Sequence, residues 1–158
     1  MPLTQVTVPP PTHTWPSASR ETWTRPRRPI AVPWLATYGA ALAGKTVIDT
    51  VNRIGAPEFD SRAIIADAAP QARYVRAFNS LGWENFADPM PGTNMFFAAD
   101  PDARATAEEL IRAVGLEPAF LGDANATTTV DGLLPLWFAL VQQNGGNRRV
   151  ALRIITEG

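Results

Sequence analysis

The sequence predicts an α/β fold, a three-layer sandwich with a mostly parallel sheet. Short segments rich in β-branched and aromatic residues alternate with longer segments rich in Ala and Leu. Strands that alternate with helices in this way favour a parallel sheet with right-handed crossovers. A chain of 158 residues is also long enough for one domain with a single core.

The expected helices and strands follow from the composition of each segment and from the Gly, Pro and capping residues at its ends. The segments typical of strands are 29–34, 45–52, 72–79, 94–99, 117–122 and 147–155. The segments typical of helices are 35–43, 59–70, 100–115 and 131–146. Asp60 or Ser61 is the expected N-cap of the second helix. The segment 80–93 is expected to be a loop with one helical turn.

The helix over 100–115 has the clearest sequence signals. Asp100 is its expected N-cap, Pro101 its first residue and Gly115 its terminator. Its expected buried face consists of Ala107, Leu110, Ile111 and Val114.

The helix within 131–146 is apolar around its whole axis, as in "LLPLWFALV". A helix of this kind must be buried in its own domain or against another subunit. The sequence leaves both options open, and a homo-oligomer through residues 131–143 is one of them.

The chain changes character near residue 30. Residues 1–29 mix Pro, Thr, Ser, Arg and Trp without helical or strand periodicity, and their prolines disfavour helix. We therefore expect residues 1–29 to be an irregular, disordered arm and residues 30–158 to be the folded domain. His13, the only histidine, lies in this arm and is expected to have no chemical role.

Composition narrows the classes of function. The net charge is −1, with 14 basic and 15 acidic residues, so neither a nucleic-acid nor a membrane partner is expected. The chain has no cysteine, which fits a reducing cytoplasm, and a single histidine, so no metal site is expected. No apolar run reaches the about 18 residues of a membrane span.

The string "GAALAGKT" at 39–46 matches the P-loop pattern G-x-x-x-x-G-K-T. A P-loop connects a strand to a following helix whose N-terminus faces phosphate. Here the helix-like segment precedes the string and the strand-like segment follows it. We therefore interpret the string as a helix-to-strand junction, with Gly44 as the C-cap, and do not expect a P-loop nucleotidase.

Ligands of open parallel sheets bind beyond the carboxyl ends of the strands, so those ends are the candidate site. Asn52 and Asn79 close two successive expected strands and should project into one crevice. Each amide can donate and accept hydrogen bonds, which suits a carboxamide or a uracil-like edge. The alternative is that both amides bond only local backbone, as in Asx turns.

Several segments, in this order and spacing, resemble the later part of the NADPH-dependent coenzyme F420 reductase family of NADP oxidoreductases. They are "IAVPW", "LAGKTVIDTVN", "YVRAFNSLGWENF", "NMFFAAD" and "DGLLPLWFALVQQNGGNRRVALR". The resemblance covers residues 30 to about 155. It implies an incomplete Rossmann-like domain that brings NADP(H) against a deazaflavin (coenzyme F420) or another small redox acceptor.

The resemblance also implies roles for individual residues. Val32, Pro33, Trp34 and Asn52 would line the nicotinamide and ribose, with Ala77 and Asn79 also on the cofactor. Phe78 and Ser80 would face the second substrate. No catalytic acid or base is implied, because hydride passes directly between two rings that the protein orients and shields from water.

The chain departs from the family at its beginning. A first strand followed by a G-x-G-x-x-G loop, which binds the pyrophosphate, is absent from the sequence. We hypothesise that residues 1 to about 29 are a divergent or frameshifted replacement for that half. An alternative function is then a catalytically inactive, truncated remnant that associates with a homologous subunit.

Overall fold

The computed structural model describes residues 31–157. The irregular arm expected over 1–29, and His13 within it, lie outside the described residues. The elements, in chain order, are α1 (Ala31–Tyr38), η2 (Gly39–Leu42), β1 (Thr46–Asp49), α2 (Arg62–Ala68), β2 (Arg73–Arg76), α3 (Glu84–Ala87), β3 (Asn94–Ala99), α4 (Arg104–Ala113), β4 (Glu117–Gly122), η3 (Ala124–Ala126), α5 (Thr127–Asp131) and α6 (Leu133–Gln143).

The four strands form one sheet in the order β1-β2-β3-β4. β1 pairs with β2 in parallel and β3 with β4 in parallel, while β2 and β3 are antiparallel. The predicted α/β class and mostly parallel sheet are confirmed. The antiparallel pair means that β1 and β2 end at one edge of the sheet, and β3 and β4 at the opposite edge.

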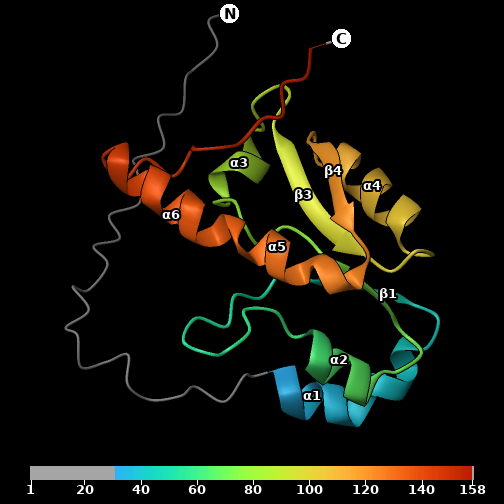
Figure 1. The fold of residues 1–158 in the computed structure, drawn as a ribbon. Coiled ribbons are helices and arrows are strands. Elements are labelled where there is room, and N and C mark those ends of the chain that lie inside the picture. Colours follow the sequence, from blue (N-terminus) through green and yellow to red (C-terminus); the bar gives the residue numbers. More distant parts are fainter. Residues whose placement is uncertain (1–30, 158) are drawn as a thin grey trace, which may run out of the picture.

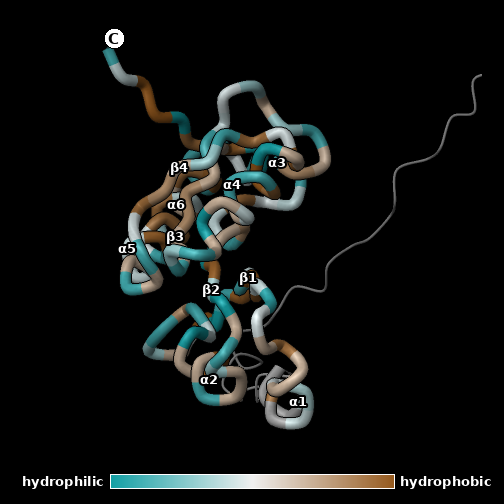
Figure 2. Tube along the Cα trace, turned by 90° about the vertical axis from the view of Figure 1, so that its right-hand side faces the viewer, coloured by the Kyte–Doolittle hydropathy of each residue, from teal (hydrophilic) through white to brown (hydrophobic). Residues whose placement is uncertain are grey.

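Helices cover the β3–β4 half of the sheet on both sides. α4 packs on one side, and α5 continues into α6 across the other (Figure 1; Figure 2). The main core lies between the sheet and α4, where Phe97 and Ile111 are fully buried. A smaller core, around Leu35, Ile65 and Tyr74, joins α1 and α2 to the β1–β2 half. No helix within residues 31–157 is long and apolar enough to cross a membrane.

The strand expected at 29–34 is wrong from residue 31 onward, because α1 begins at Ala31. Ala and Leu favour helix, and Pro33 lies in the first turn, where a missing N–H removes no helical hydrogen bond. β1 is consequently the edge strand of the described sheet.

The start and the buried face of the helix predicted over 100–115 both change. α4 begins at Arg104 and not at Pro101, because the Asp100 carboxylate accepts a hydrogen bond from the Tyr74 N–H at 2.7 Å and does not cap the helix. Leu110, expected on the buried face of α4, is 39% exposed, whereas Ala107 and Ile111 are buried as predicted.

The last expected strand, 147–155, does not form. Its segment is held by isolated bonds: the Trp137 Nε1–H donates to the Val150 carbonyl at 2.9 Å, and the Asn94 N–H donates to the Leu152 carbonyl at 3.0 Å. Because these bonds do not continue along β3, no ladder is established.

The P-loop-like string is a helix-to-strand junction, as its flanking composition predicts. Gly39 opens η2, which ends at Leu42 with Ala43, and not the expected Gly44, as its C-cap. Gly44 follows with φ of +69°, and Thr46 opens β1. The Lys45 N–H donates to the Leu42 carbonyl at 2.9 Å. A backbone amide used in this way is not available to cradle a phosphate.

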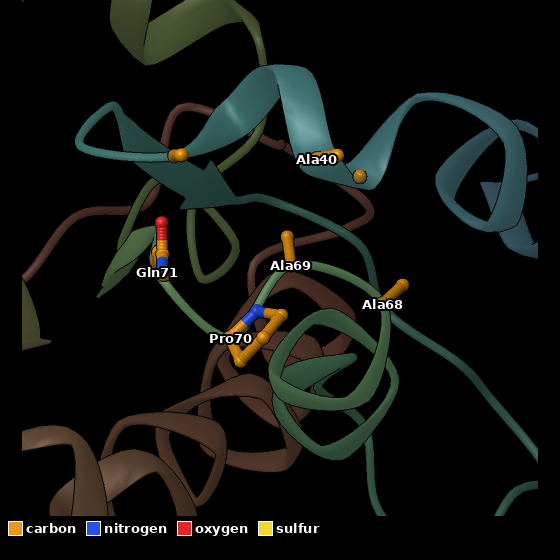
Figure 3. Close-up of a pocket in the computed structure, with 7 residues that line it drawn as sticks. Ala40, Ala68, Ala69, Pro70 and Gln71 are labelled. Carbon is orange, nitrogen blue, oxygen red and sulfur yellow. The ribbon is translucent and has the colours of Figure 1, made fainter.

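Gly39 is required by a close approach between η2 and the end of α2. A Cβ built at Gly39 would lie 1.9 Å from the Ala68 carbonyl oxygen. The approach is flanked by an apolar hollow of about 260 Å³, lined in part by Ala40, Ala69 and Pro70 (Figure 3). Its walls carry no charged side chain, so the hollow offers packing without acid–base chemistry.

We expect Gly39→Ala to lower the free energy of unfolding by about 1–3 kcal/mol, because η2 must move away from α2. Urea unfolding followed by circular dichroism measures this. Gly132→Ala is the matched control, since Gly132 has a helical φ of −60° and a Cβ there would meet nothing closer than 3.4 Å. Equal effects of the two substitutions would contradict the close approach.

Candidate functional site

The carboxyl ends of β1 and β2 lie side by side. Asp49 and Arg76, their last residues, are register partners in the parallel pair. Each strand is followed three residues later by an asparagine, Asn52 after β1 and Asn79 after β2. The Asn52 Nδ2–H donates to the Asn79 carbonyl at 2.8 Å, across 27 positions of sequence. The structure thus brings the two asparagines together through a long-range bond, not through local Asx turns.

Arg76 is the centre of the polar network at this edge. Its side chain is fully buried. Nη1 donates to the carbonyls of Asp49 at 3.2 Å and Val51 at 2.6 Å, and it lies 3.4 Å from Asp49 Oδ1. Nη2 donates to Asn52 Oδ1 at 3.2 Å. The planar guanidinium therefore ties the end of β1 to the segment that follows it.

Asp131, at the end of α5, is the acidic partner of Arg76. Its Oδ1 accepts hydrogen bonds from Arg76 Nε at 2.8 Å, Arg76 Nη2 at 2.5 Å and Asn79 Nδ2 at 3.1 Å. Burial raises the pKa of the Asp131 carboxyl, with smaller contributions from the charges of Asp60 and Asp49, and Arg76 opposes them. Because Asn79 and Arg76 donate to the same oxygen of Asp131, the ion pair between Arg76 and Asp131 also positions the Asn79 amide.

Asp49 forms the other side of the network. Its Oδ2 accepts hydrogen bonds from the Tyr74 hydroxyl at 3.0 Å and the Ser61 N–H at 2.5 Å, and its Oδ1 accepts from the Val51 N–H at 3.1 Å. Burial, followed by the Asp49 charge, raises the pKa of Tyr74, so this phenol stays protonated and acts as a donor. The start of α2 is fixed to the end of β1 in this way.

The segment after β2 adopts an uncommon backbone conformation. Phe78 has φ of +62°, the only positive φ at a residue other than glycine between 31 and 157. The Met95 sulfur accepts a hydrogen bond from the Phe78 N–H at 3.3 Å, and the Phe78 ring packs edge-on against Phe86 at 5.8 Å. Strain of this kind costs about 1–3 kcal/mol and is typical of functional sites.

The neighbours of Phe78 are enclosed. Ala77 is fully buried, and Asn79 and Ser80 are 3% and 5% exposed. The Asn79 Oδ1 is buried and accepts no hydrogen bond from the described residues. A buried acceptor without a donor is costly, so a ligand amide or hydroxyl that donated to it would remove an existing penalty.

The three remaining predicted residues belong to the first described helix. Val32, Pro33 and Trp34 lie on α1, which packs against α2, and not at a strand end as expected. The side chains of Val32 and Pro33 are outside the described part of the structure. Trp34 is 52% exposed and its ring lies 5.5 Å from that of Tyr38.

Three members of the network, Asp49, Arg76 and Asp131, were not among the predicted site residues. A signal for two of them exists in the sequence, because Asp49 and Arg76 are charges that directly follow apolar residues in expected strands, and buried charges need partners. Asp131 lies 55 positions from Arg76 and has no such local signal. No group of three His, Asp or Glu side chains within 31–157 is arranged to hold a metal ion.

Comparison with known proteins supports the fold of this chain. The structure is similar to the crystal structure of a proposed F420-dependent NADP reductase from Arthrobacter sp. FB24, with a TM-score of 0.66 and 21% sequence identity. The match covers 78% of this chain and 63% of that protein. The chain therefore spans less than two-thirds of that neighbour. The fold that the two share is Rossmann-like.

A second similar structure is a hypothetical protein from Sinorhizobium meliloti, with a TM-score of 0.49 and 29% identity over 59% of this chain and 53% of that protein. No protein-family model matches the chain, and no curated protein matches it.

Proposed function

We propose that this chain is an oxidoreductase that transfers hydride between NADP(H) and a deazaflavin such as coenzyme F420, or another small redox acceptor. The carrying observation is the pair Asn52 and Asn79, fixed together beyond the carboxyl ends of two adjacent parallel strands. Ligands of open α/β sheets bind at such ends. The Rossmann-like fold shared with a proposed F420-dependent NADP reductase supports the assignment.

The chemistry of the site suits a carboxamide ligand. The Asn79 Oδ1 lacks a donor among the described residues and is closed off from solvent, so the 77–80 segment must open before the N–H₂ group of a nicotinamide carboxamide can supply one. When bound, the nicotinamide supplies the hydride. The role of the protein is to hold the ring and exclude water, for which the enclosed segment from Ala77 to Ser80 is suited.

The sequence contains no G-x-G-x-x-G loop, so the strongest anion-binding element of such folds is absent. We therefore expect NADPH to bind through its nicotinamide and ribose, with a dissociation constant on the order of micromolar. The expected cofactor roles of Val32, Pro33 and Trp34 remain predictions, which now require α1 to approach the carboxyl ends of β1 and β2.

The first test is NADPH binding by isothermal titration calorimetry. We expect Asn79→Ala to weaken binding about three- to tenfold, as loss of about one net hydrogen bond predicts. Asn125→Ala is the matched control, because Asn125 is exposed on η3 outside the network. ATP with Mg²⁺ should not bind, since the P-loop-like string is a junction.

No NADPH binding by the folded chain would contradict the proposal. Binding that Asn79→Ala and Asn125→Ala leave equally strong would place the nucleotide elsewhere. If NADPH binds as expected, reduction of coenzyme F420, followed by its loss of absorbance, identifies the acceptor.

The alternative function is an association module, favoured by the outer face of α6. Leu136 is 45% exposed and Phe138 is 41% exposed, and α6 carries no charged residue. Such a face is typical of a helix that a partner covers. Two measurements together distinguish the functions. An association module forms stable oligomers in sedimentation equilibrium and binds no NADPH in the calorimetric titration.

A further inference from the structure

A second hollow lies on the far side of Asp131, between the segment 57–60 and the junction of α5 with α6. Its volume is about 260 Å³. Pro57, Phe59 and Pro135 supply apolar walls, and Glu58, Asp60 and Asp131 supply carboxylates. Sites for drug-sized ligands measure about 300–1,000 Å³, so this hollow suits a smaller molecule.

Asp131 presents one oxygen to the network and the other to the hollow. Oδ1 accepts all three hydrogen bonds from Arg76 and Asn79. Oδ2 accepts none from the residues that the structure describes, although the side chain is only 10% exposed. The carboxylate is therefore held by one oxygen, while the other has no donor within residues 31–157 and remains accessible from the hollow.

The charges around the hollow favour a cation. Its lining contains carboxylates but no basic side chain. Arg53 lies beside the lining, where its Nη1 donates to the Asp60 carbonyl at 3.2 Å. The fully buried Arg76 is already bonded to Asp131, Asn52 and the backbone at the end of β1. Burial is the main cause that raises the pKa of Asp131, and the negative charges of Asp60 and Asp49 add to it.

We propose that this hollow binds a small organic cation. Its ammonium, guanidinium or amidinium group donates to Asp131 Oδ2, and its apolar body lies against Phe59 and the two prolines. A cation here completes the hydrogen bonding of Asp131 and offsets the carboxylates, as charge-assisted hydrogen bonds do in sites shielded from water. The site shares Asp131 with the polar network around Asn79, but its occupation needs no nucleotide.

The probe is benzamidine, which joins a flat ring to a planar cation. Titration of the ¹⁵N-labelled chain, followed by ¹H–¹⁵N correlation spectra in the absence of nucleotide, should shift the amides of Phe59, Asp131 and Gly132 to saturation. A ligand of this size is expected to bind with a dissociation constant on the order of 1 mM. Benzamide, its neutral analogue, should bind at least tenfold more weakly.

Two variants test the location. Asp131→Asn should weaken benzamidine binding at least tenfold, but it also disturbs Arg76. Gly132→Leu places a side chain at the wall of the hollow without touching that pair, and the φ of −60° at Gly132 accepts any residue. It should also weaken binding at least tenfold.

Thr129→Leu is the matched control, because Thr129 is exposed on α5 and does not line the hollow. It should leave binding unchanged. Equal affinities for benzamide and benzamidine would overturn the proposal, as would full binding by Gly132→Leu. Either result is separable from the NADPH test, which uses a different ligand.

Discussion

Arg76→Leu is expected to lower the free energy of unfolding by about 3–5 kcal/mol. The substitution removes the fully buried guanidinium and leaves Asp131, together with Asp49, without its cationic partner. It also deprives the carbonyls of Asp49 and Val51 of a donor. Leu supplies apolar volume, so the loss measures uncompensated polar groups more than a cavity.

Urea unfolding at pH 7 measures this loss, and Arg112→Ala is its control. Arg112 also forms an ion pair, with Glu108 at 3.2 Å, but its side chain is 56% exposed. Exposed pairs on one helix contribute about 0.3–0.5 kcal/mol, so Arg112→Ala should have a small effect. A loss below about 1 kcal/mol for Arg76→Leu would mean that the network does not hold this edge of the sheet together.

Arg76→Lys separates charge from geometry. Lysine keeps the positive charge but cannot reproduce the fork that contacts Asp131, Asn52 and two carbonyls at once. We therefore expect a free energy of unfolding between those of the unchanged protein and Arg76→Leu. NADPH binding should weaken in the same way as in Asn79→Ala, because Asn79 and Arg76 both donate to Asp131.

Phe97→Ala has the second large expected effect, a loss of about 3–5 kcal/mol in the free energy of unfolding. Phe97 is fully buried in β3, and its ring centroid lies 5.4 Å from that of Phe120 on β4. Ile111 of α4 belongs to the same core cluster. Truncation leaves a cavity between sheet and helix that neither element can close without moving.

Phe138→Ala is the matched control for Phe97→Ala, since Phe138 is 41% exposed on α6. In a monomer it should cost less than about 1 kcal/mol. A loss that grows with protein concentration would instead show that a second copy covers α6, because association stabilises the folded state by mass action. Comparable losses for the two substitutions at low concentration would contradict the burial that separates Phe97 from Phe138.

Part of the candidate site could be predicted from order along the chain. Asn52 and Asn79 were placed together because each closes one of two successive strands, and parallel strands end at the same edge. Asp49 and Arg76 could have been found by the same logic, as charges that directly follow apolar residues in expected strands. Asp131 could not, because its role depends on where α5 crosses the sheet.

Local sequence preferences are enough to establish the alternation of strands and helices, the junction around Gly44 and the two asparagines beyond neighbouring strand ends. These depend on composition, on periodicity and on the few residues that accept a turn, all of which act locally. The tertiary structure decided the rest. Residues 31–34 are helical, the 147–155 segment forms no ladder, and Phe138 is exposed while Arg76 is buried. The physical reason is that pairing, burial and ion pairing depend on residues distant in sequence, whereas local propensity differs by only about 1 kcal/mol per residue.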